Sequence, residues 1–147
     1  MTTTAPNADA RTLGLAHYAA RGVLETVLAR YGTTFQQMIA LRVVATAEAP
    51  VERDEVVGYV VTSLKVEAED AEAVVEELTT KGLITAEASR LRLTDAGREL
   101  FTESSTEQAE ISARIWGDIP VEDLAAAGRV LSLVTERANK ELAALSA

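Results

Sequence analysis

The hydrophobic positions of the chain fall mostly at helical spacing. Over residues 12–31, apolar side chains recur every three or four positions and therefore share one face of a helix. That face carries Leu13, Ala16, Ala20, Leu24, Val27 and Tyr31. Gly32 follows as a stop, and Thr33 or Thr34 can cap a second helix over residues 35–47. The pattern predicts two consecutive helices in the first third of the chain.

A second pair of helices follows Pro50. The first covers residues 53–63, although its β-branched residues favour helix only weakly. Its inward positions are Val56, Val57 and Val60. The second covers residues 68–81, where apolar residues at i, i+3, i+4 and i+7 form a stripe that faces a core. That stripe consists of Ala71, Val74, Val75 and Leu78. Lys81 and Gly82 end the helix, because glycine suits the turn that follows it and a cation suits the negative end of its dipole.

Alternation with a period of two then replaces the helical spacing. Residues 83–86 and 90–93 predict the two strands of a short β-hairpin. Leucines and arginines alternate along the second strand and therefore point to opposite faces of the sheet. Leu91 and Leu93 are on one face, and Arg90 and Arg92 are on the other.

Two long helices complete the predicted structure, which is mainly α with a small β-hairpin. Thr94 and Asp95 cap a helix that ends near Trp116, and the last helix runs from after Pro120 to about Leu145. Spacings of four and three alternate along the last helix, which indicates a seam that packs against another helix. The seam consists of Leu124, Gly128, Leu131, Thr135, Ala138, Leu142 and Leu145. An intramolecular partner would satisfy the seam, but a long terminal helix favours contact with a second copy of the chain.

Charge singles out one of these helices. The chain of 147 residues has a formal net charge of −9, and residues 48–77 hold ten acidic residues against Arg53 and Lys65. The predicted helix over residues 68–81 overlaps this acidic block, so its solvent-facing side is nearly all carboxylate. Acidic groups in the first turn of a helix are each favoured by ~0.3–1 kcal/mol. The run can therefore be an ordinary solvated face.

Composition excludes several classes of site. The chain has no cysteine, which rules out disulfides, thiolate metal sites and a thiol redox switch. His17 is the sole histidine, and the acidic residues lack the spacing of a calcium loop. No catalytic or phosphate-binding motif occurs, so we expect no enzyme, metal or cofactor. No apolar stretch is long enough to span a membrane, which favours a soluble cytoplasmic protein. Residues 1–10 are expected to form a flexible tail.

Two segments resemble the MarR family of bacterial transcriptional regulators. LTTKGLI at residues 78–84 is similar to the end of that family's recognition helix, and LRLTDAGREL at residues 91–100 is similar to the junction between its wing and the next helix. The resemblance implies a single domain over residues 11–147. It contains a winged helix-turn-helix over residues 33–98, flanked by dimerisation helices over residues 11–32 and 99–147.

The resemblance also implies a function, a homodimeric repressor that places one recognition helix per subunit in the major groove of double-stranded DNA. The positions that would contact DNA are Lys65, Glu69, Asp70, Glu72, Ala73, Glu76, Arg90 and Arg92. Family members release DNA when a small effector binds, and His17 and Trp116 are candidate ligand-binding residues, although each is also accounted for as a surface or core residue. The carboxylates replace the neutral or basic side chains that the family offers to bases. An alternative is therefore a winged-helix dimer that no longer binds DNA and presents its acidic helix to a basic protein partner.

Overall fold

The computed structural model describes residues 5–147 and falls into two compact units, one ending at Ala109 and the other beginning at Glu110. Of the predicted flexible tail, residues 1–4 lie outside the described residues. Residues 5–9 precede the first helix, and the Asp9 side chain caps that helix by accepting a hydrogen bond from the backbone N–H of Thr12 at 2.8 Å.

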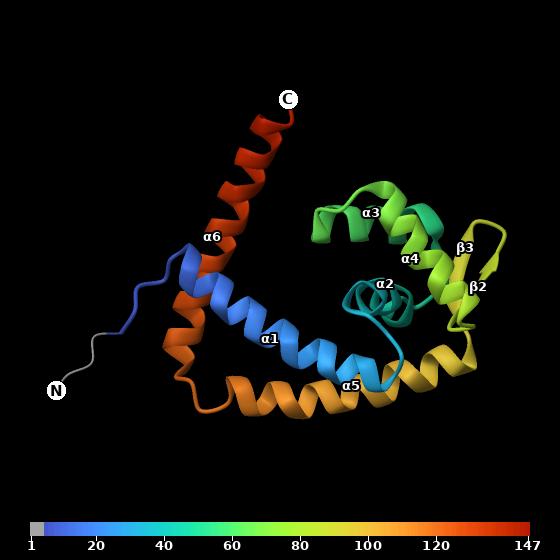
Figure 1. Ribbon diagram of the computed structural model, residues 1–147, viewed down its shortest axis with the longest axis horizontal. Coiled ribbons are helices and arrows are strands. Elements are labelled where there is room, and N and C mark those ends of the chain that lie inside the picture. Colours follow the sequence, from blue (N-terminus) through green and yellow to red (C-terminus); the bar gives the residue numbers. More distant parts are fainter. Residues whose placement is uncertain (1–4) are drawn as a thin grey trace. The chain divides into compact units, whose positions relative to one another are not determined.

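Four helices of the first unit lie where the hydrophobic pattern predicts them (Figure 1). They are α1 (Ala10–Arg30), α2 (Phe35–Thr46), α3 (Arg53–Leu64) and α4 (Ala68–Thr80). Thr34 and Gln37 form a reciprocal capping box at the start of α2, which confirms the predicted cap. The β-branched α3 is helical because Val56 and Val60 are fully buried, and this packing outweighs their weak intrinsic preference.

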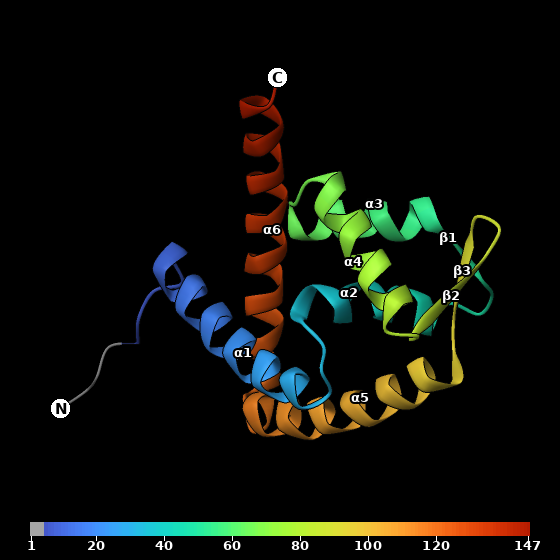
Figure 2. The same ribbon diagram turned by 45° about the vertical axis from the view of Figure 1, so that its right-hand side comes forward.

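A three-stranded antiparallel sheet extends the predicted hairpin. Its strands are β1 (Val51–Glu52), β2 (Ile84–Glu87) and β3 (Arg90–Leu93), in the order β1-β3-β2 (Figure 2). The sequence predicted β2 and β3 but missed β1, because a strand of two residues is too short to show an alternating pattern. Val51 pairs with Leu91 and Glu52 pairs with Arg90, so β1 ties the start of α3 to the wing.

One core joins the helices of the first unit to the sheet. Its fully buried large side chains are Leu28, Met38, Leu41, Val56, Val60, Val75, Leu78, Ile84 and Leu91. The apolar stripe predicted for α4 is buried in this core at all four of its positions. The opposite side of α4 is therefore left to solvent.

The segment LTDAGREL joins the wing to α5 (Asp95–Trp116) through a close backbone contact. The Thr94 hydroxyl accepts a hydrogen bond from the Gly97 N–H at 3.0 Å, and the Thr94 N–H donates to the carbonyl oxygen of Leu83 at 3.1 Å. A Cβ added to Gly97 would lie 2.0 Å from that same carbonyl oxygen. Only glycine fits at this position, and this steric limit explains the glycine of the LTDAGREL segment.

The second unit contains the end of α5 and the helix α6 (Val121–Leu145). No residue of α6 is buried in this chain. Its exposed large apolar side chains include Val130, Leu131, Leu133, Val134, Leu142 and Leu145. Within residues 5–147, no helix is both long enough and apolar enough to cross a membrane.

Candidate nucleic-acid interface

The solvent-facing side of α4 carries the predicted DNA-binding positions of this helix. Glu69, Asp70, Ala73 and Glu76 are exposed, and Glu72 is partly exposed. The helix has no side-chain hydrogen bond at its N-cap, and Glu69 and Asp70 occupy its first turn, where the dipole favours negative charge. The face is thus open to a partner, and it is acidic from its first turn.

Most basic side chains around α4 already have partners within the protein. Arg53, at the start of α3, donates from Nε and Nη2 to Glu72 Oε2 at 3.1 and 2.9 Å, and from Nη2 to Glu76 Oε1 at 2.7 Å. Lys65 donates to the carbonyl oxygen of Thr62 at 2.6 Å, near the C-terminal end of α3. These two cations therefore stabilise the helix-turn-helix itself.

The two wing arginines are exposed but paired. Arg90 Nε lies 3.0 Å from Glu52 Oε1, and Arg92 Nη2 lies 2.7 Å from Glu87 Oε1. Hydrogen bonds from the Ser89 hydroxyl and from Arg90 lower the pKa of Glu52, which keeps this carboxylate charged. Exposed pairs of this kind contribute only ~0–1 kcal/mol each, so a phosphate can replace the carboxylate as the partner of either arginine.

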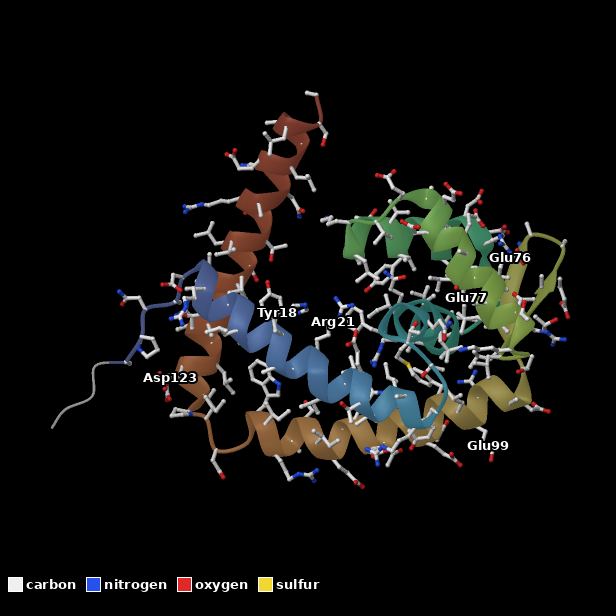
Figure 3. All side chains as sticks on the ribbon, viewed as in Figure 1. Tyr18, Arg21, Glu76, Glu77, Glu99 and Asp123 are labelled. Carbon is white, nitrogen blue, oxygen red and sulfur yellow. The ribbon has the colours of Figure 1, made fainter. Side chains whose placement is uncertain are left out.

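Glu76 and Glu77, adjacent in the sequence, are labelled on α4 in Figure 3 and contact different elements. Glu76 contacts Arg53 of α3, whereas Glu77 accepts a hydrogen bond from Gln37 Nε2 of α2 at 2.7 Å. By contrast, Glu67, Glu69 and Asp70 form no ion pair within the described residues. The uncompensated charge thus lies at the N-terminal end of α4.

Sequence reasoning missed Arg53 and Glu52 as members of this surface. Arg53 lies 19 and 23 residues before the two glutamates that it contacts, so no local spacing indicates the contact. The sequence feature that could have indicated this contact is the scarcity of positive charge around Arg53, because Arg53 and Lys65 are the only basic residues within residues 48–77. One of two cations in a block of ten acidic residues is expected to contact an acidic side chain.

A groove on the first unit is a separate candidate for a small-molecule site. It has a volume of about 290 Å³ and is lined by Ile39, Arg42, Val43, Thr46, Ala47 and Tyr59. The Arg42 guanidinium lies 5.8 Å from the centre of the Phe101 ring and forms no ion pair with any described residue. The groove therefore offers apolar walls and one cation without a carboxylate partner.

The two predicted ligand residues do not line this groove. His17 is exposed on α1, with its ring centre 6.0 Å from that of Tyr18 in an edge-on arrangement. Trp116 is 56% exposed at the end of α5 and belongs to the second unit. A role for either residue in ligand binding remains a prediction.

Comparison with known proteins identifies the fold. No family model matches the sequence, and no curated protein matches it. Solved structures do match over most of their length. A MarR family transcriptional regulator from Silicibacter pomeroyi has a TM-score of 0.69 at 20% identity, covering 86% of this chain and 89% of that one.

Two further similar structures hold partners. The MarR family protein Rv2887 of Mycobacterium tuberculosis, in complex with DNA, has a TM-score of 0.64 at 19% identity and covers 87% of this chain and 98% of its own. CouR from Rhodococcus jostii, bound to p-coumaroyl-CoA, has a TM-score of 0.69 at 16% identity and covers 84% and 88%. The chain has the winged-helix fold of the MarR family regulators, as its LTTKGLI and LTDAGREL segments predicted.

Proposed function

We propose that the protein is a homodimeric regulator of transcription that binds duplex DNA, represses the genes it controls and responds to a small ligand. The observation that carries the proposal is the geometry of α4. This helix buries one stripe in the core and exposes the opposite side next to a wing that carries Arg90 and Arg92. An exposed helix beside a wing is the arrangement by which winged-helix proteins enter the major groove, and the similar Rv2887 fold was solved with DNA.

The wing supplies the positive charge for the phosphates, and the carboxylates of α4 supply selectivity. Affinity for DNA of any sequence depends on cations that neutralise phosphates. Glutamate can accept a hydrogen bond from the N4 amino group of cytosine in the major groove. A helix rich in carboxylate repels the DNA phosphate backbone at every sequence. It binds only at sequences where such hydrogen bonds to bases form. We therefore expect feeble non-specific binding and a narrow choice of sites.

The exposed apolar side chains of α6 support a homodimer. A long helix that buries no residue in its own chain exposes apolar area that a second copy can cover. Closed twofold dimers are the commonest assemblies of soluble proteins, and they place two recognition helices on successive major grooves. The predicted seam residues Leu131 and Leu142 are 42% and 44% exposed in the single chain, as an uncovered interface requires.

The groove beside Arg42 supports the response to a ligand. Its apolar walls and the Arg42 guanidinium suit an aromatic carboxylate, since the ring can bury against the walls and the carboxylate can pair with Arg42. Titration calorimetry with p-coumarate and related aromatic acids tests this. Arg42→Gln should abolish binding, while His17→Gln and Trp116→Phe test the two residues that the sequence suggested. Binding that survives Arg42→Gln and is lost in either of the other variants would move the ligand site away from the groove.

The decisive experiment is binding to DNA. Fluorescence anisotropy with labelled duplexes from the region upstream of the protein's own gene, followed by selection from a random duplex library, would reveal a preferred site. A specific site should bind with a Kd of about 10⁻⁸–10⁻¹¹ M at physiological salt. A protein that binds no duplex at low salt and enriches no sequence would refute the proposal.

A second candidate function is favoured by the charges at the N-terminal end of α4. Glu67, Glu69 and Asp70 are exposed and form no ion pair with the residues that the structure describes, whereas Arg53, Arg90 and Arg92 each contact carboxylates. Such a surface suits a basic protein partner. Replacing Glu69, Glu72 and Glu76 with glutamine distinguishes the two functions. A DNA-binding protein should gain affinity for random duplex more than for its preferred site, whereas a protein that binds a basic partner should lose that partner.

A further inference from the structure

Arg53 contacts two carboxylates of α4 at once. Its Nε and Nη2 both donate hydrogen bonds to one oxygen of Glu72, and Nη2 also donates to one oxygen of Glu76. Glu72 and Glu76 stand four residues apart on the same side of α4, an arrangement of like charges that destabilises a helix when nothing compensates it. The Arg53 side chain, at 29% exposed, is less exposed than either carboxylate. The cation thus lies beneath the two acidic groups and leaves them at the surface.

Each carboxylate retains an oxygen for another partner. Arg53 occupies Oε2 of Glu72 and Oε1 of Glu76, and the remaining oxygens, Oε1 of Glu72 and Oε2 of Glu76, accept no hydrogen bond from the described residues. Partial burial disfavours the charged form of Arg53, but the hydrogen bonds to Glu72 and Glu76 outweigh it and raise the pKa of the guanidinium. Arg53 therefore remains charged, and one oxygen of each carboxylate is left for another partner.

The residue that precedes Arg53 fixes the wing. Glu52 accepts hydrogen bonds from the Ser89 hydroxyl at 2.7 Å and from Arg90 Nε at 3.0 Å. The backbone N–H of Arg53 donates to the carbonyl oxygen of Ser89 at 2.8 Å. The two consecutive residues of one short segment thus connect the tip of the wing to the exposed side of α4. The backbone hydrogen bond from Arg53 to Ser89 and the pairing of β1 with β3 do not involve the Arg90 side chain, so they still connect the wing to α4 when DNA takes Arg90 from Glu52.

We propose that Arg53 is a specificity-determining positioning residue, which orients the free oxygens of Glu72 and Glu76 to accept hydrogen bonds from base amino groups. The inference rests on the proposed function, since it assumes that α4 enters the major groove. Glutamate side chains are flexible, and a carboxylate that must be ordered at the moment of binding loses part of its discrimination to entropy. A carboxylate already held through its other oxygen avoids that loss. Arg53 also offsets one of the two negative charges that the phosphates would meet.

An Arg53→Lys variant tests the orientation of the two carboxylates separately from the positive charge beside them. Lysine keeps the positive charge but lacks the planar fork that reaches two carboxylates at once. The experiment selects preferred sequences from a random duplex library with the parent dimer, and then measures binding of each single-base variant of the selected site. A variant that combines Glu72→Gln with Glu76→Gln identifies the base pairs whose preference depends on these carboxylates. A good contact of this kind discriminates roughly 5- to 150-fold between bases.

At those base pairs, Arg53→Lys should lose a preference of at least about fivefold while its affinity for random duplex stays at the parental value. Arg53→Gln should lose both the preference and the general affinity, because it removes the charge as well. Lys140→Gln, which removes one exposed cation from an i,i+4 pair on α6, serves as the matched control for net charge and should change neither. Circular dichroism spectra and melting curves of each variant establish that the fold is retained.

The outcomes separate this inference from the function on which it rests. A parent that enriches no sequence refutes the proposed function and the role of Arg53 together. A parent that enriches a sequence, with Arg53→Lys retaining the full preference at the glutamate-dependent base pairs, overturns the role of Arg53 alone. The role of Arg53 is also overturned if the Glu72→Gln, Glu76→Gln variant loses no preference at any base pair. This measurement does not depend on the folding of the Arg53 variants.

Discussion

Replacing Arg90 and Arg92 with glutamine tests whether the wing supplies the phosphate contacts. Both side chains are more than half exposed, at 63% and 56%, and each has one exposed carboxylate partner. Breaking such a pair costs only ~0–1 kcal/mol, so DNA can take over both guanidinium groups. The glutamines keep polar side chains at both positions of the strand and remove two positive charges.

The expected magnitude follows from counterion release. Each phosphate contact contributes about 0.9 to the slope of log K against log salt concentration on duplex DNA, so the double variant should lose about 1.8 from that slope. Between 50 and 200 mM salt, a slope of 1.8 corresponds to about a twelvefold change in affinity. The parent should therefore lose about twelve times more affinity than the variant over this range. At low salt the variant should bind much more weakly.

Fluorescence anisotropy at four salt concentrations measures both slopes on one labelled duplex. A variant that combines Arg137→Gln with Lys140→Gln removes the same two positive charges from α6, and its slope should remain parental. Parallel lines for the parent and the wing variant would refute the reasoning, because the wing would then make no phosphate contact.

Three further changes test the fold and the assembly. Gly97→Ala should destabilise the protein by roughly 1–3 kcal/mol or more in chemical denaturation, because its Cβ would meet the Leu83 carbonyl oxygen at 2.0 Å; an unchanged midpoint would contradict the steric role of the motif. Ala88→Gly should stabilise the wing by up to ~1 kcal/mol, because Ala88 has a φ of 55°, and a melting temperature below the parental one would refute this. Replacing Leu131 and Leu142 with aspartate should cost the dimer several kcal/mol, visible as monomer in analytical ultracentrifugation. A variant that stays dimeric would place the interface elsewhere.

The sequence predicted most of the fold because its signals are local. The apolar stripe of α4 and the capping box at Thr34 each act within a few residues of chain, so their spacing is visible without a structure. The helices of the first unit accordingly begin and end close to their predicted limits. The short strand β1 was missed, since its two residues are held by pairing with β3 rather than by any pattern of their own.

The arrangement of charge on α4 could not be predicted, because it depends on contacts between distant residues. The sequence showed an acidic helix and two wing arginines as separate features. In the structure, Arg53 joins Glu72 to Glu76, and Glu52 joins β1 to Arg90. These contacts require the packing of α3 against α4 and the pairing of β1 with β3, which local spacing does not encode. The positions named from the resemblance are exposed, apart from the partly exposed Glu72, and their contact with DNA remains a prediction. Their partners within the protein were missed.

Net charge alone is a poor guide to whether this surface meets DNA. At physiological salt, the field of an exposed charge is screened over about 8 Å, so a phosphate responds to the groups beside it rather than to the total of −9. Along α4 the balance changes from one end to the other. Among residues 5–147, Glu69 and Asp70 of the first turn form no ion pair, whereas Glu72 and Glu76 share Arg53. The N-terminal end of α4 should therefore repel the DNA backbone most strongly. It should bind only in a groove where base amino groups donate hydrogen bonds to its carboxylates. Affinity for random sequence should then come from the wing and disappear as salt is raised.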